Sequence, residues 1–417
     1  MIKSSVVRSA RTVKKQDKTK IHVSGLQIGM HICELDRPWL ETPFLMQGFL
    51  LETPQDIECV AEVCEYVYID EVRDTLVRPE ERIVSNRNQS KPRYIHKVPS
   101  NQEHSKIHGF HREARGITKT LLDEVRLGNA LNMKQVKQTV SECVDSILRN
   151  QFALLWLSQI KDKDDYLAEH SLNVAILAIT FGRHLQLPEE DLEKLGVCGM
   201  LHDVGKTKIP EEILNKPSKL NREEFAIMRQ HTTFGSKLLV GKSDVYSGAV
   251  DVAHNHHEML DGSGYPRGLK DHKLNPFTRM ITLVDIYDAM TSERCYKAGN
   301  SSLSALKILY AGKGTKYDSH LVTEFIKCIG LYPVGNLVEL KNGCVAIVVS
   351  NNYQNRRLPR IHLLLNENKK PVDGYVIDTA KVKNNEKMAG YEIVNVLPAG
   401  CHGLKLQELI ERGIKLE

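Results

Sequence analysis

Apolar residues in the middle of the chain recur at intervals of three and four, which is the period of one face of an α-helix. One such stripe predicts a single helix through Met133, Val136, Val140, Cys143 and Ile147. Similar segments follow one another with short breaks over residues 151–312, among them Tyr166 to Leu187 and Arg279 to Glu293. The pattern therefore predicts an all-α bundle for this part of the chain.

Both ends of the chain have the pattern of short strands instead. Before the helices, Ile21 to Cys33 and Tyr66 to Ile69 are strand-like, and a helix that starts after Thr53 separates them. After the helices, the turn Lys341-Asn342-Gly343 lies between two apolar segments and predicts a β-hairpin. We expect a mainly α protein with a small N-terminal α/β domain and a small C-terminal β module.

Shifts in composition suggest where these parts begin and end. The stretch before the long helices is rich in Arg, Glu, Asn, Gln and Ser and contains three prolines, as linkers often do. We expect a basic flexible tail at 1–20, the α/β domain at 21–72, the linker at 73–106, a helical connector at 107–150, the helical catalytic domain at 151–328, and the β module with a terminal helix at 329–417.

Charge and cysteine content restrict the classes of partner and compartment. The net charge is +5, and residues 1–20 carry seven Lys and Arg against one Asp, so the rest of the chain is close to neutral. Such a balance does not favour a nucleic acid polymer as partner. Nine scattered cysteines without a C-x-x-C pair favour reduced thiols and a cytoplasmic location, and no apolar run is long enough for a transmembrane segment.

The strongest chemical feature is a set of histidines and aspartates spread over successive predicted helices. It offers five imidazoles and two carboxylates, which could converge inside a bundle: His170, His202, Asp203, His231, His256, His257 and Asp285. A nitrogen-rich ligand set suits iron, manganese or zinc better than calcium or magnesium. Lys206 follows the His-Asp pair and places a positive charge where a phosphate would bind.

A second feature follows the His pair directly. Two glycines precede Tyr265 and Pro266, and Arg267 and Lys270 add positive charge beside them. Glycine allows the backbone to approach a ligand closely, and a proline forces the residue before it to be extended. We interpret Gly264, Tyr265, Pro266 and Arg267 as part of a substrate-binding loop, with a partner-binding surface as the alternative for Tyr265 and Pro266.

Together these motifs resemble the HD-GYP domain, a bacterial branch of the HD metal-dependent phosphohydrolases that hydrolyses cyclic dinucleotides. The resemblance covers about residues 150–312, and residues 21–72 are similar to a domain often found ahead of HD-GYP domains. It implies a cyclic di-GMP phosphodiesterase that produces linear pGpG. A 3′,3′-cyclic GMP-AMP phosphodiesterase, a catalytically weak receptor and a general nucleotide phosphohydrolase are the alternatives.

The resemblance also implies roles for individual residues. One divalent metal ion would be bound by His170, His202, Asp203 and Asp285, and the other by Asp203, His231, His256 and His257. Asp203 and Lys206 would be catalytic, Arg294 and Lys297 would contact phosphate or guanine, and Asp288 would bind substrate beside the base. Some members bind a third metal through a Glu that is Tyr166 here, so we expect two ions, iron or manganese. A homodimer or a signalling-protein partner is left open.

Overall fold

The computed structural model describes residues 18–37, 49–51, 54–70, 94, 98, 100–158, 166–292, 301–352, 358–382, 390–398, 400–404 and 408–409. The chain divides into two compact units, residues 1–83 and 84–417. Among the described residues, no helix is both long enough and apolar enough to cross a membrane.

The first unit contains a four-stranded antiparallel sheet with the strand order β1-β4-β2-β3. Its elements are β1 (Thr19–His22), β2 (His31–Leu35), β3 (Phe49–Leu50), α1 (Pro54–Val63) and β4 (Tyr66–Asp70). Ile32, Val60 and Val67 are fully buried and form the centre of its core. The predicted α/β arrangement is therefore confirmed.

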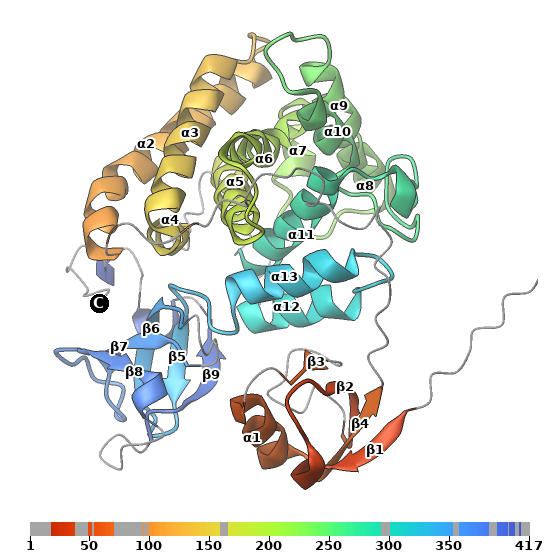
Figure 1. The fold of residues 1–417 in the computed structure, drawn as a ribbon. Helices are drawn as coiled ribbons and strands as arrows, with labels where there is room; N and C mark the ends of the chain where they lie inside the picture. The colour runs from red at the N-terminus through yellow and green to blue at the C-terminus, as the bar shows by residue number, and fades with distance from the viewer. Residues whose placement is uncertain are drawn as a thin grey trace, which may run out of the picture. The chain divides into compact units, whose positions relative to one another are not determined.

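The second unit begins with a bundle of helices (Figure 1). Its helices are α2 (Ser100–Arg126), α3 (Met133–Arg149), α4 (Gln151–Leu157), α5 (Tyr166–His184), α6 (Glu189–Leu201), α7 (Glu211–Leu214), α8 (Arg222–Arg229), α9 (His231–Leu239), α10 (Ser247–Asn255), α11 (Pro276–Thr291), α12 (Ser302–Ala311) and α13 (Ser319–Ile329). Helix α5 is buried along nearly its whole length because α2, α6 and α11 all pack against it. The predicted bundle is confirmed, as is the buried stripe of α3.

Helix α2 begins at Ser100, within the polar stretch expected as a linker. Its first turn contains Glu103, which is fully buried. Both carboxylate oxygens of Glu103 accept hydrogen bonds from the guanidinium of Arg149 on α3, at 2.8 and 2.9 Å. A long-range ion pair thus fixes the start of a helix whose composition alone is typical of a linker.

The C-terminal part is a five-stranded antiparallel sheet with the order β8-β7-β6-β5-β9. Its strands are β5 (Leu337–Leu340), β6 (Val345–Ser350), β7 (Arg360–Leu365), β8 (Val376–Asp378) and β9 (Ile393–Leu397). The predicted β5–β6 hairpin is present, with Gly343 in the left-handed conformation at its turn. Phe152 and Trp156 of α4 belong to the core of this sheet. Most of the predicted terminal helix 403–414 lies outside the described residues.

Candidate metal centre

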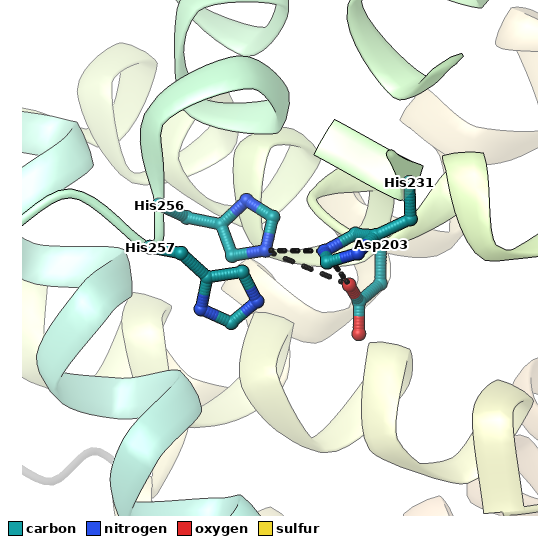
Figure 2. Close-up of side chains that lie close together, drawn as sticks. All are labelled: Asp203, His231, His256 and His257. Carbon is teal, nitrogen blue, oxygen red and sulfur yellow. Dashed lines mark hydrogen bonds and ion pairs between the residues drawn. The ribbon is translucent and has the colours of Figure 1, made fainter. Parts of the chain in front are cut away.

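The seven predicted ligand residues come from five helices or their ends. His170 is in the first turns of α5, and His202 and Asp203 follow the last residue of α6. The remaining four lie at the start of α9, at the end of α10 and in the middle of α11: His231, His256, His257 and Asp285. They form two neighbouring groups, one of His170, His202 and Asp285 and the other of Asp203 and the remaining histidines (Figure 2), with ligand atoms within 4.8 Å of one another in each group.

Asp203 lies between the histidines of the two groups. Its Oδ2 is 3.3 Å from His202 Nε2 and 3.5 Å from His170 Nε2. Its Oδ1 is 3.3 Å from His231 Nε2 and 3.5 Å from His256 Nε2, as Figure 2 shows. Only 1% of the Asp203 side chain is exposed, so neither oxygen depends on bulk water. Each oxygen of one carboxylate therefore faces a different pair of imidazoles.

The outward-facing ring nitrogens determine which imidazole atoms can bind a cation. The Nδ1 atoms of His202, His231 and His256 lie 2.6, 2.6 and 3.1 Å from the carbonyl oxygens of residues 199, 228 and 252. A carbonyl oxygen only accepts, so Nδ1 carries the hydrogen and the Nε2 lone pair points inward.

Asp203 Oδ1, toward which two of these lone pairs point, is buried and has no hydrogen-bond donor among the described residues. Acceptor atoms that converge in this way repel one another unless a positive charge lies between them. The residues present therefore fit a divalent cation, and the cluster is a metal-binding site in its donor chemistry.

His170 is oriented by a carboxylate instead of a carbonyl group. Its Nδ1 lies 2.8 Å from Asp288 Oδ2, and its Nε2 lies 3.1 Å from Asp285 Oδ1. A carboxylate behind a ligand histidine fixes the orientation of the ring and makes the imidazole a stronger ligand. Asp288 was expected beside the substrate base; the structure places its buried carboxylate behind His170.

Burial and neighbouring charges set the protonation of the cluster. Burial lowers the pKa of His231 to about 3 and that of His257 well below its ordinary value, so both rings are neutral. Burial opposes ionisation of Asp203, but the charge of Lys206 together with the contacts of His202 and His170 outweighs it and holds the pKa of that carboxyl well below its usual range. Burial also opposes protonation of His170, but nearby Tyr166 and three carboxylates outweigh it and raise the pKa of that ring. A proton on His170 occupies the place that a cation would take.

Lys206 and Gly205 lie in the turn that follows Asp203. Lys206 Nζ contacts Asp203 Oδ2, and the lysine side chain is 15% exposed. A β-carbon on Gly205 would lie 1.9 Å from the carbonyl oxygen of His231. Glycine is therefore required here for α9 to bring His231 toward Asp203.

The loop after the His pair lies against His257. The ring of Tyr265 lies 4.7 Å from the ring of His257 between centroids, and burial raises the pKa of Tyr265, so its phenol stays protonated. A β-carbon on Gly264 would lie 2.4 Å from the carbonyl oxygen of His257. This glycine thus allows the loop to pass close to the backbone that follows the His pair. Pro266 follows Tyr265 in a cis peptide bond.

The anchor of this loop is a residue that no sequence motif singled out. Glu258 is buried, and its carboxylate accepts hydrogen bonds from the backbone N–H groups of Arg267 and Leu269, at 2.6 and 2.9 Å. The Arg267 guanidinium, which was expected to bind substrate, donates to Asn255 Oδ1 at 2.9 Å. The only sequence signal for Glu258 was an acidic residue directly after two histidines.

Two of the predicted substrate contacts, Arg294 and Lys297, lie outside the described residues. Tyr166, which stands where the resemblance implies a third-metal Glu, stacks on His170 with ring centroids 5.6 Å apart and planes 6° apart. Its ring therefore lies against a ligand of the first group.

Comparisons with known proteins found two matching family models. A family model described as an HD domain matches residues 156–321, and one described as a domain of unknown function (DUF3391) matches residues 18–136. A Pseudomonas aeruginosa protein named cyclic di-GMP phosphodiesterase is 32% identical over 382 residues, which cover 89% of this chain and 92% of that protein.

Two further relatives match less than half of the chain. A cyclic di-GMP phosphodiesterase of Thermotoga maritima is 32% identical over 46% of this chain and 52% of its own length. A Vibrio cholerae protein named 3′3′-cGAMP-specific phosphodiesterase is 34% identical over 41% of this chain and 37% of its own length. Since the Pseudomonas relative matches nearly the whole chain, this protein belongs to the HD-GYP family of cyclic dinucleotide phosphodiesterases.

Proposed function

We propose that this protein is a metal-dependent phosphodiesterase that hydrolyses cyclic di-GMP to linear pGpG. The observation that carries the proposal is the position of Asp203, whose two buried oxygens face two separate pairs of imidazoles. A carboxylate in this position can bridge two cations, which is the arrangement used for in-line attack on phosphodiesters. The names of the relatives support the choice of substrate.

The donor set supports two divalent ions, which we propose to be iron or manganese. His170, His202, Asp203 and Asp285 would bind one ion, and Asp203, His231, His256 and His257 the other. Five imidazoles with two carboxylates suit these metals better than magnesium or calcium, which prefer oxygen ligands. Tyr166 has a phenol where a third ion would need a carboxylate, so we propose that the site is dinuclear.

When bound, the ions supply Lewis-acid polarisation of the phosphate and a water of lowered pKa. Asp203 fixes the spacing of the two groups. Lys206, which contacts Asp203 and is partly exposed, provides a positive charge beside the reacting phosphate. The protonated phenol of Tyr265 can donate a hydrogen bond to a substrate oxygen. Water oxygen bonds to phosphorus and the bond to the 3′ oxygen breaks, which leaves a 5′-phosphate and a 3′-hydroxyl.

Incubation of the full chain, loaded with Fe(II) or Mn(II), with cyclic di-GMP tests the proposal. We expect chromatography to show a linear dinucleotide with a 5′-phosphate as the first product. An intact cyclic substrate would refute the proposal. An early mononucleotide without a linear intermediate would contradict the single cut that a dinuclear site implies.

A second candidate substrate is 3′,3′-cyclic GMP-AMP, because several relatives from Vibrio cholerae are named as specific for it. The two substrates differ in one base, so parallel turnover measurements distinguish them. A catalytically weak receptor is less well supported, because all seven expected ligands lie in the cluster. We further propose a cytoplasmic location, which is supported by seven cysteines with free thiols.

A further inference from the structure

The open side of the metal centre is at His257. Its side chain is 21% exposed, whereas those of the other six ligand residues are between 0 and 6% exposed. A substrate phosphate therefore approaches the cluster over His257. The ring that lies against His257 is Tyr265, with the two ring planes tilted by 32°.

Helix α8 contributes a cation to the same place. The guanidinium carbon of Arg229, the last residue of α8, lies 4.6 Å from the centroid of the Tyr265 ring. Phe225, one turn earlier, contacts the same ring edge-on with centroids 6.2 Å apart. Two side chains of α8 thus hold this end of the helix against the loop, and Tyr265 lies in contact with both His257 and Arg229.

Within the part of the chain that the structure describes, no acidic side chain neutralises the charge of Arg229. Its guanidinium lies over the ring of Tyr265 instead. Among the described cations near the site, Lys206 contacts Asp203 beside the metal groups and Arg267 donates to Asn255. Cation–π contact orients a guanidinium while leaving its N–H groups able to donate. Arg229 is therefore an oriented, half-buried donor beside the entrance.

We propose that Arg229 binds the phosphodiester group of the cyclic dinucleotide that is not being cleaved. A cyclic dinucleotide carries two phosphodiesters in one ring, and the metal centre can neutralise only the one that reacts. The second phosphodiester needs a hydrogen-bond donor that lies away from the metal groups, on their open side. A guanidinium matches the geometry of a phosphate. The inference rests on the proposed function and adds a substrate-binding residue, which Tyr265 positions.

Two probes of the metal-loaded full chain test Arg229→Gln. The first is a phosphorothioate analogue of cyclic di-GMP, whose binding is measured by calorimetry. The second is bis(p-nitrophenyl) phosphate, which has one phosphodiester. We expect Arg229→Gln to weaken analogue binding, and to raise KM for cyclic di-GMP, by about 10- to 100-fold. Turnover of bis(p-nitrophenyl) phosphate should stay at the wild-type rate.

Arg229→Lys should recover part of the affinity, because it keeps the charge and loses the planar fork. The matched control is Arg222→Gln, which changes an exposed arginine at the other end of α8 and should alter neither probe. Analogue binding should also depend less on salt in Arg229→Gln than in the wild type.

Unchanged analogue binding in Arg229→Gln would overturn the inference, and so would an equal loss of turnover with bis(p-nitrophenyl) phosphate, since Arg229 would then act at the reacting centre. A wild-type protein that binds the analogue through Arg229 but cleaves no cyclic dinucleotide would support the inference and refute the proposed function. Cleavage and binding of cyclic di-GMP that do not depend on Arg229 would support the proposed function and refute the inference.

Discussion

The substitution Asp203→Asn tests the bridging carboxylate with almost no change in shape. Each oxygen of Asp203 lies 3.3–3.5 Å from two imidazole Nε2 atoms, one pair on each side. An amide replaces one of these oxygens by an NH2 group, which has no lone pair for a cation. One metal group therefore loses its shared ligand, and the other keeps only a neutral one.

We expect bound metal to fall from two ions per chain to one or none. Turnover should fall by at least about 1,000-fold, which corresponds to about 4 kcal/mol of lost transition-state stabilisation. Metal content is measured by mass spectrometry after desalting, and turnover by chromatography of cyclic di-GMP and its linear product.

The control for this experiment is Asp191→Asn on α6. The Asp191 carboxylate is 40% accessible and lies outside both ligand groups. It should keep both metals and full turnover. If Asp203→Asn retained two ions and wild-type turnover, the bridging role of Asp203 would be refuted.

Three further predictions concern the surroundings of the site and the fold. Asp288→Ala should weaken metal binding or turnover by about 10- to 100-fold, because His170 loses the carboxylate that orients it; normal metal affinity, measured by competition with a chelator, would contradict this. Glu103→Ala should destabilise the fold by about 1–3 kcal/mol, because it removes two charge-assisted hydrogen bonds to a partly exposed arginine of α3; urea unfolding measures the loss, and a change below about 0.5 kcal/mol would contradict it. Burial opposes ionisation of Glu324, but hydrogen bonds from a histidine and a lysine outweigh it and lower its pKa to about 2. Its ionised form therefore contributes stability above the ordinary pKa of 4.5, up to about 3 kcal/mol, which is lost as the pH falls from 4.5 toward 2; the difference in urea midpoint between wild type and Glu324→Gln should shrink over that range.

The sequence alone determined the helices and the identity of the candidate ligands. Helical periodicity is local, so the stripe from Met133 to Ile147 was sufficient to predict a buried face that the structure confirms. The His-Asp and His-His pairs are likewise adjacent in the sequence, and two single histidines and Asp285 on the other predicted helices completed the candidate set.

Only the tertiary structure decided how these side chains are used. That the two oxygens of Asp203 face different histidine pairs depends on the packing of α5, α9 and α10 around one turn. The contact of Asp288 with His170 and that of Arg229 with Tyr265 join residues 118 and 36 positions apart. Periodicity shows which face of a helix is buried, but the neighbours of that face are set by how distant helices pack. For that reason the ligand types could be predicted, whereas their orienting partners and the cation at the entrance could not.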